Sequence, residues 1–410
     1  MSVRASLRAM CEPGPAYLLA GRAVQLANGL LLSAIVIRRF GLDVVGSFAL
    51  GIAAVTVLAK LCPLGLAAYL PRLDDRHPRV AFTGLGLLAA QAPVVVGLLA
   101  AYALWEGRTA DEARLVFAVA LGGYWIAFAN VGLMLSIMRG RFRPGLLAPM
   151  CETTSLVLGA GLAPTPTVLA VVLLAGRFAG VLVIWGGFSF ERVPAARLVR
   201  DARRSAHYLG LDVLSTGADD VAPLILAGQV TREELGLFRL CQQLLGASDS
   251  PCWTFVQSRY PDLVARGRPA VERLARQLLA IGGVATVVCL VVSFVLAHTV
   301  LRTPAVVPFM LVLAPSLAFR FRSYLFGQAF RAAGRVWEAA QLGVLRLLTS
   351  IALCWSASRA FGVWGAVWAI AAIGVIFGIV YAWRYRGAPA AEPAFEPPLT
   401  KPPSRRRAPA

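Results

Sequence analysis

Residues 277–297 read QLLAIGGVATVVCLVVSFVLA, an apolar stretch without a charged side chain. A helix rises about 1.5 Å per residue, so about 20 such residues cross the hydrocarbon layer of a membrane. Similar stretches recur along the 410-residue chain, which is 58% hydrophobic and only 15% charged. Only helices and closed barrels satisfy their backbone in lipid, and barrel strands alternate apolar and polar residues. The sequence therefore predicts a bundle of membrane-spanning helices.

The apolar runs and the short polar breaks between them predict about twelve spans. These are 15–37, 44–70, 80–104, 115–138, 145–163, 167–189, 206–228, 235–258, 277–297, 304–326, 336–357 and 362–383. The other segments are expected to be a cytoplasmic N-terminus at 1–14, an interlobe linker at 191–205 and a disordered, Pro- and Arg-rich cytoplasmic tail at 386–410. The expected fold is an all-α, polytopic membrane protein.

The net charge of +19 has an explanation in this topology. A soluble protein of such charge would suggest nucleic-acid binding, but this chain is too apolar for that class. Membrane proteins instead concentrate Lys and Arg in their cytoplasmic loops. With the N-terminus inside, only seven of the 40 basic residues fall in outer loops: Arg38, Arg39, Arg108, Arg114, Arg232, Arg302 and Arg359. This bias predicts an even number of spans and two cytoplasmic termini.

The two halves of the chain match each other at an offset of 190 positions. Gly46-Ser47-Phe48 corresponds to Gly236-Leu237-Phe238, and 70–73 (LPRL) corresponds to 260–263 (YPDL). Both matches fall at equivalent ends of an even-numbered span. The repeat predicts six-helix lobes at 15–190 and 206–385, with a substrate site between them. The alternative is that recurring helix-end chemistry produces these matches without a repeat.

Charged side chains inside the spans are candidates for function, because a charge at mid-bilayer costs at least ~2.5 kcal/mol. The candidate substrate cavity consists of Arg22, Gln25, Asn28, Lys60, Arg177 and Arg346. The candidate ion-coupling or counter-ion residues are Asp212, Asp219, Asp220 and Asp249. A basic cavity suits an anionic substrate such as a diphosphate. For each residue the alternative is a structural ion pair, and Arg239, near the outer end of its span, is explained by snorkelling.

Several motifs resemble those of a known family. Residues 39–50, RFGLDVVGSFAL, resemble the turn after the first span of Wzx-like polysaccharide flippases, which export O-antigen and exopolysaccharide. Residues 235–244 (LGLFRLCQQL), the 260–263 segment and the Gly334-Arg335 step are also similar to this family. The family belongs to the multidrug/oligosaccharidyl-lipid/polysaccharide exporter superfamily. The resemblance covers roughly 15–385, and it implies two six-helix lobes around a V-shaped central cavity.

The resemblance also implies a function. It is the movement of an undecaprenyl-diphosphate-linked oligosaccharide from the inner to the outer leaflet of the bacterial plasma membrane, driven by a proton or sodium gradient. Membrane lipids, a polysaccharide polymerase and its chain-length machinery are the expected partners, without nucleic acid, cofactor or metal. The chain has no GxxxxGK[ST], HExxH or GxSxG motif, so we expect no enzyme. The alternatives are a drug or small-cation exporter of the same superfamily, and a membrane-embedded glycosyltransferase or ligase.

Overall fold

The computed structural model describes residues 13–62, 66–70, 77–216, 221–259, 263 and 266–387. Every regular element within these ranges is a helix. The first lobe contains α2 (Pro13–Phe40), α3 (Leu42–Leu61), α4 (Leu66–Tyr69), α5 (His77–Glu106), α6 (Ala110–Met138), α7 (Pro144–Leu162) and α8 (Pro166–Trp185).

The second lobe contains α10 (Ala222–Leu226), α11 (Arg232–Ser258), α13 (Arg268–Thr299), α14 (Val306–Leu313), the 3-10 helix η2 (Ala314–Ser316), α15 (Leu317–Ala332) and α16 (Val336–Gly387). One further helix, α9 (Ala195–Thr216), connects the lobes. The segment 191–205, expected to be a linker, is thus helical from Ala195 onward.

Eight helices in the described part of the chain are long and apolar enough to cross a membrane. They are Ala16–Phe40, Pro78–Glu106, Ala110–Met138, Pro144–Leu162, Pro166–Trp185, Arg268–Thr299, Val306–Ala332 and Trp337–Gly387. The expected spans 44–70, 206–228 and 235–258 correspond to α3 with α4, α9 with α10, and α11. In the first two of these pairs the helices are separated by residues outside the described part of the chain, 63–65 and 217–220, and α11 carries charged side chains.

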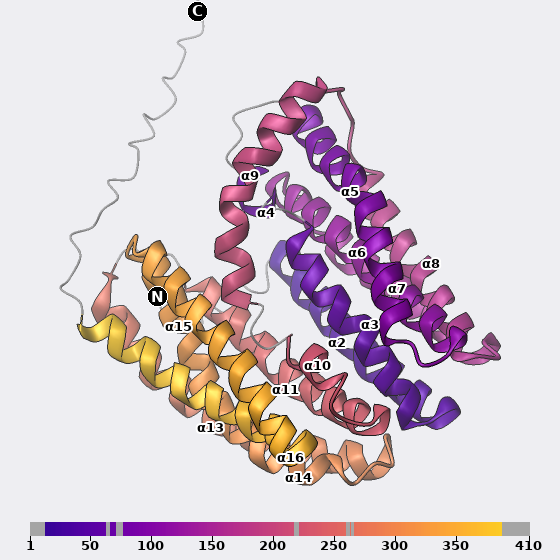
Figure 1. The fold of residues 1–410 in the computed structure, drawn as a ribbon. Helices are drawn as coiled ribbons and strands as arrows, with labels where there is room; N and C mark the ends of the chain where they lie inside the picture. Colours follow the sequence, from indigo (N-terminus) through magenta and orange to yellow (C-terminus); the bar gives the residue numbers. More distant parts are fainter. Residues whose placement is uncertain are drawn as a thin grey trace, which may run out of the picture.

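The long helix α16 accounts for the last two expected spans, because it contains a sharp turn. Gly362 has φ 59° and ψ −142°, a conformation that is essentially restricted to glycine. Figure 1 shows the two halves of α16, orange and yellow, running back beside each other from this turn.

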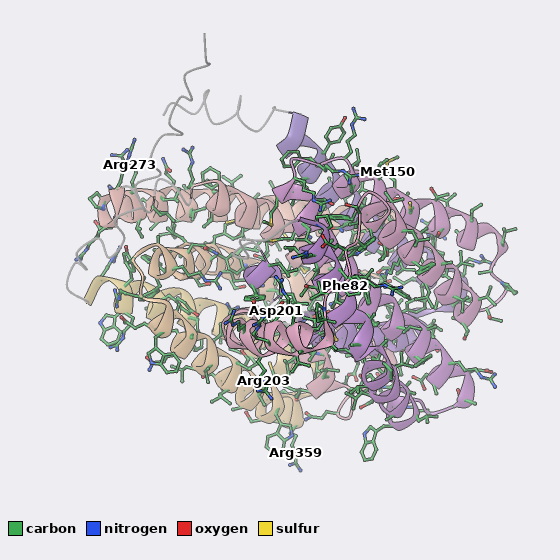
Figure 2. All side chains as sticks on the ribbon, turned by 90° about the horizontal axis from the view of Figure 1, so that it is seen from above. Phe82, Met150, Asp201, Arg203, Arg273 and Arg359 are labelled. Carbon is green, nitrogen blue, oxygen red and sulfur yellow. The ribbon has the colours of Figure 1, made fainter. Side chains whose placement is uncertain are left out.

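The two lobes form the arms of a V (Figure 1). They meet where α3 packs against α11, and they diverge toward the ends where α5 begins and α15 ends. One buried apolar cluster runs through the meeting point and includes Phe48 and Leu50 from α3 with Phe238 from α11. The helix α9 contacts α4 and α5 of the first lobe and α16 of the second. Figure 2 shows it between the lobes, at the labelled Asp201 and Arg203.

Candidate functional site

A cavity of about 360 Å³ lies between the lobes. Its polar lining is Gln25 of α2, Arg239, Gln242 and Gln243 of α11, and Arg320 of α15. Gln25 and the neighbouring Gly29 lie near the middle of α2, whose apolar part, Ala16–Phe40, is long enough to cross a membrane. The cavity is therefore at mid-membrane depth and between two lobes, which is where transporters built from repeats bind their substrates.

The polar lining from α11 forms one face of that helix, because positions 242 and 243 lie about one turn after position 239. The Arg239 guanidinium donates to Gln242 Oε1 at 3.5 Å. Gln243 Oε1 accepts a hydrogen bond of 2.7 Å from Ser33 Oγ of α2, which joins the two lobes at the cavity. The polar lining therefore contains two guanidinium groups, those of Arg239 and Arg320, and several side-chain amides.

Arg320 reaches the cavity wall as half of an ion pair. Its Nε and Nη2 donate to Asp249 Oδ2 at 3.0 and 2.6 Å, and the Tyr324 hydroxyl donates to the same oxygen at 3.2 Å. Only 7% of the Arg320 side chain and 10% of the Asp249 side chain are exposed. Asp249, a candidate for ion coupling or a counter-ion, is thus joined to an arginine of the cavity.

Of the candidates in α2, only Gln25 lines the cavity. Arg22 is exposed one turn earlier, and its Nη1 donates to Gln25 Oε1 at 3.1 Å. Asn28 is buried on another face, where its Nδ2 donates to the Pro149 carbonyl at 3.1 Å and its Oδ1 accepts from Thr153 Oγ1 at 2.8 Å. Asn28 therefore holds α2 against α7.

The remaining candidates do not come together at this cavity. Arg177 of α8 donates to Glu152 of α7 at 2.8 Å, inside the first lobe. Arg346 is buried within α16 and is not among the lining residues. Lys60 belongs to α3 and Asp212 to α9, but their side chains are outside the described part of the structure. Asp219 and Asp220 lie entirely outside the described residues.

Two cavity residues were missed by the sequence analysis. Snorkelling was expected to account for Arg239, and Arg320 was not among the candidate residues, whereas both line the cavity. For Arg239 a signal existed in the sequence, since Gln242 and Gln243 share its helical face. For Arg320 the signal was its position inside the expected span 304–326, whereas its pairing with Asp249, 71 positions away, could not be read from the sequence.

At the meeting point of α3 and α11, a polar cluster joins the lobes. The Arg232 guanidinium of α11 donates to Glu112 Oε1 of α6 at 2.8 Å and to the Glu106 carbonyl at 2.5 Å. Ser47 of α3 donates to the same Glu112 oxygen at 2.8 Å. Arg38 of α2 adds a second connection, because its Nε donates to the Val300 carbonyl at the end of α13 at 3.0 Å. These contacts hold the lobes together at one end of the cavity.

No family model matches this chain, and no curated protein does. Solved structures do match. One is an inward-facing multidrug resistance MATE family transporter of the MOP superfamily, with a TM-score of 0.71 at 14% identity. The alignment covers 90% of this chain and 97% of the transporter. A MOP superfamily transporter from Pyrococcus furiosus has a TM-score of 0.65 at 14% identity, covering 90% and 93%. The lipid II flippase MurJ, in an inward closed conformation, has a TM-score of 0.74 at 11% identity, covering 90% and 87%.

The chain shares the fold of these three structures. This confirms the expected all-α, polytopic architecture, and the shared fold extends over nine-tenths of the chain. At such identities the likeness concerns the fold alone. Membership of the Wzx-like polysaccharide flippases, which the motifs predict, stays a prediction.

Proposed function

We propose that this protein is a membrane transporter that moves a lipid-diphosphate-linked saccharide from the inner to the outer leaflet. The observation that carries the proposal is the cavity at mid-membrane depth, where Arg239 lies among Gln25, Gln242 and Gln243. A guanidinium binds phosphate oxygens through charge-assisted hydrogen bonds. Side-chain amides both donate and accept, as sugar hydroxyls require. Arg22 and Lys60 are proposed to extend the basic surface toward this substrate.

The arrangement of the lobes supports alternating access as the mechanism. The cluster of Arg232, Glu112 and Ser47 closes the end where α3 meets α11, while the lobes diverge at the other end. Breaking this cluster and bringing the diverging ends together would expose the cavity to the opposite side. The fold resemblance to the lipid II flippase MurJ supports a lipid-linked substrate for this chain.

In this proposal a proton or sodium gradient drives transport, and no resident cofactor takes part. The protein belongs to the bacterial plasma membrane with both termini cytoplasmic. A polymerase that receives the flipped saccharide is the expected partner. An imposed gradient across proteoliposomes, with either ion, tests the coupling directly.

A drug or small-cation exporter is the second candidate. It is favoured by the position of Asp249, whose carboxylate lies next to the cavity lining, and by the resemblance to a multidrug resistance transporter. In that case the carboxylate, rather than Arg239, would bind the substrate. The two candidates therefore predict opposite sensitivities to substitution of these two residues.

A glycosyltransferase or ligase acting on the same lipid is less well supported. Such an enzyme would need a large outer loop that carries catalytic acids. The described connections on the predicted outer side are short: residues 107–109, 163–165, 227–231 and 300–305. The solved structures of this fold reported above are named as transporters or flippases.

Proteoliposomes that contain a fluorescent undecaprenyl-diphosphate oligosaccharide test the proposal. Transfer between leaflets is read from the access of a membrane-impermeant quencher to the sugar. We expect Arg239→Gln to slow transfer about tenfold or more, because a hydrogen bond to a charged group is worth about 1.5–3 kcal/mol. Arg239→Lys should retain part of the rate, and Arg359→Gln, which removes an exposed arginine elsewhere, should leave it unchanged.

The same vesicles distinguish the flippase from the drug or small-cation exporter. Efflux of a fluorescent lipophilic cation that is abolished by Asp249→Asn and unaffected by Arg239→Gln would favour the drug exporter. An absence of saccharide transfer by the unsubstituted protein, under either ion gradient, would overturn the flippase proposal.

A further inference from the structure

One hydrogen bond joins the two lobes at the wall of the mid-membrane cavity. Ser33 Oγ of α2 donates to Gln243 Oε1 of α11 at 2.7 Å, and Ser33 is only 4% exposed. Ser33 follows Leu30, the last residue of α2 in the cavity lining, by about one turn in the direction of Arg38. The bond therefore lies on the side of the cavity where the lobes meet.

This bond determines which end of the Gln243 amide serves the cavity. An amide side chain has one oxygen, which accepts, and one nitrogen, which donates. The Ser33 hydroxyl occupies the oxygen end and turns it toward α2. Because the two ends of an amide point in different directions, Nε2 is the end that remains for a ligand in the cavity that Gln243 lines.

Two other glutamines of the lining are oriented by the same kind of contact, but from within their own helices. Gln25 Oε1 accepts from Arg22 Nη1 at 3.1 Å, and Gln242 Oε1 accepts from Arg239 Nη1 at 3.5 Å. An arginine side chain can only donate, so the oxygen of each amide must face its arginine. Gln243 differs from them because the donor to its oxygen belongs to the opposite lobe.

The space next to this bond is open on both helices. Gly29, one turn before Ser33, and Gly246, about one turn after Gln243, both line the cavity. A Cβ atom on either glycine would meet nothing within 4 Å. A ligand therefore has room beside both partners of the bond.

Ser33 has a second acceptor within reach. The Gly29 carbonyl, one turn back on α2, lies 3.1 Å from Ser33 Oγ. When the lobes separate, the hydroxyl turns to this carbonyl and remains satisfied, as serines in helices commonly are. Gln243 has lost its orienting partner at that point, so the effect of separation falls on the residue that faces the ligand.

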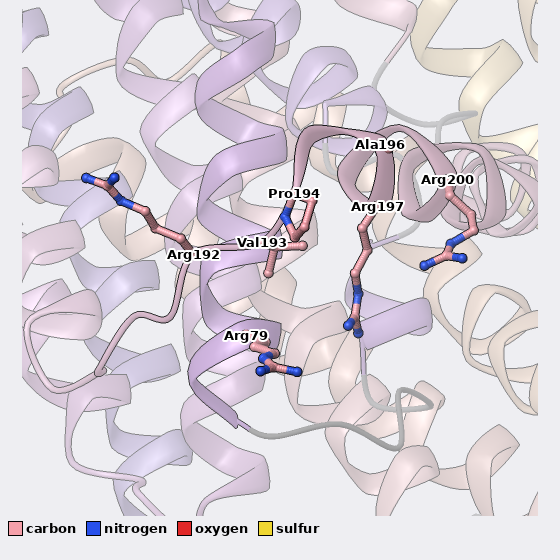
Figure 3. A pocket seen from close by; sticks show the side chains of 7 residues that line it. All are labelled: Arg79, Arg192, Val193, Pro194, Ala196, Arg197 and Arg200. Atoms are coloured by element: carbon pink, nitrogen blue, oxygen red, sulfur yellow. The ribbon is translucent and has the colours of Figure 1, made fainter.

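The bond belongs to the arrangement in which the opposite ends of the lobes are apart. Those ends lie on the side that the distribution of arginine predicts to be cytoplasmic. Figure 3 shows that the molecule is hollowed there by a separate cavity of about 610 Å³, between Arg79 of α5 and Arg197 of α9. In the proposed transport from the inner to the outer leaflet, this arrangement takes up the substrate.

We propose that Ser33 is a positioning residue, which holds the Gln243 amide as a hydrogen-bond donor toward the substrate only while the outer ends of the lobes are together. The cavity thus binds a substrate rich in acceptor groups more tightly in this arrangement than after the outer ends separate. Affinity that differs between two arrangements couples binding to the motion of the lobes. The direction of release rests on the proposed function, whereas the effect of the bond on the lobes does not.

The first test measures the lobes without any ligand. Spin labels on Arg114→Cys and Arg359→Cys, at the predicted outer ends of α6 and α16, report their separation in nanodiscs of the full chain without native cysteines. We expect Ser33→Ala to raise the fraction of long distances about threefold, as the loss of one neutral hydrogen bond predicts. Ser350→Ala is the matched control and should change nothing, because this serine is equally buried (3% exposed) and donates to the Arg346 carbonyl of its own helix.

The second test separates the two roles of Gln243. In Gln243→Glu the carboxylate still accepts from Ser33 but offers no N–H to a ligand. The ligand-free distances should stay at those of the parent, while affinity for the fluorescent undecaprenyl-diphosphate oligosaccharide falls about tenfold or more. Ser33→Ala should weaken this affinity about threefold, and Ser33→Thr, which keeps a hydroxyl, should restore both measurements.

Unchanged distances in Ser33→Ala would overturn the proposal, as would an equal change in Ser350→Ala. Unchanged affinity in Ser33→Ala at altered distances would also overturn it, because the bond would then join the lobes without orienting Gln243. An absence of saccharide binding by the unsubstituted protein would count against the proposed function. The ligand-free distances would still decide whether Ser33 joins the lobes.

Discussion

Gly46 of α3 packs against the backbone of α11, and Gly236 of α11 packs against the backbone of α3 through the equivalent contact. A Cβ atom on Gly46 would collide with the carbonyl oxygen of Arg232, and one on Gly236 would collide with the carbonyl oxygen of Leu42. Gly236 follows Gly46 by 190 positions, and Arg232 follows Leu42 by the same number. A reciprocal contact of this kind is the signature of two-fold symmetry. It supports an internal repeat whose axis passes between the two glycines.

The first prediction concerns this crossing. Gly236→Ala should push α11 away from α3, because the neighbouring atoms are backbone and cannot rotate away. Overpacking of this kind costs about 1–3 kcal/mol. We expect spin labels on cysteines introduced at Arg114 and Arg359, in a background without native cysteines, to show a larger separation than in the parent. Double electron–electron resonance spectroscopy measures the distance between the two labels.

Gly97→Ala is the matched control for this experiment, because a Cβ there would meet nothing within 4 Å. It should leave the label distances at those of the parent. The same distances in Gly236→Ala as in Gly97→Ala would show that the close crossing does not hold the lobes together.

The repeat and the spans could be predicted because their signals are local or periodic. Apolar runs and the Gly-Ser-Phe and Gly-Leu-Phe matches can be read without knowledge of contacts. The start of α9 could not be read from hydropathy, since residues 195–205 contain four arginines and have no membrane-like character. Its helical period was the relevant signal there, because Asp201 and Ser205 are buried on one face while Arg200 and Arg203 are exposed.

The second prediction concerns the turn inside α16. Gly362→Ala should cost about 1–3 kcal/mol, since an alanine would be forced into the φ of 59° that this turn requires. A Cβ at this position meets nothing within 4 Å, so backbone strain is the only source of the loss. The thermal unfolding midpoint is the measurement. Gly283→Ala, at a helical position with equally open surroundings, is the control and should be neutral or stabilising.

The third prediction separates structural charges from cavity charges. Arg177 pairs with Glu152 at 2.8 Å, and their side chains are only 16% and 20% exposed. Arg177→Met should lower stability by about 3 kcal/mol, because it leaves the carboxylate buried without its partner. Adding Glu152→Gln should restore most of that stability, and transport by the double variant should stay within about twofold of the parent.

Arg239→Met is the counterpart of that variant. It should lower transport with little change in unfolding midpoint, since Arg239 faces the cavity. A large transport loss in the Glu152→Gln, Arg177→Met variant at normal stability would instead place Arg177 in the substrate path.

The site could be predicted only in part, because its residues are joined across the fold. Gln25 and Asn28 are both candidates on the first expected span and lie about one helical turn apart, yet Gln25 lines the cavity whereas Asn28 faces α7. A helical stripe fixes which residues share a face but does not say which neighbour covers that face. That information depends on how α2 packs between α7 and α11, a long-range property.

The final prediction concerns Asp249 and Arg320. Asp249→Asn should lower the free energy of unfolding by about 3–5 kcal/mol, since it leaves a buried guanidinium unpaired. Asp249→Asn combined with Arg320→Gln removes both charges and should recover most of this loss. Asp111→Asn, in an exposed pair of similar length with Arg114 (3.1 Å), should cost under about 1 kcal/mol.

The recovered double variant then decides the role of the carboxylate. If it still transports with the same ion dependence, the Asp249–Arg320 pair is structural; if transport loses its dependence on the gradient, the pair takes part in coupling.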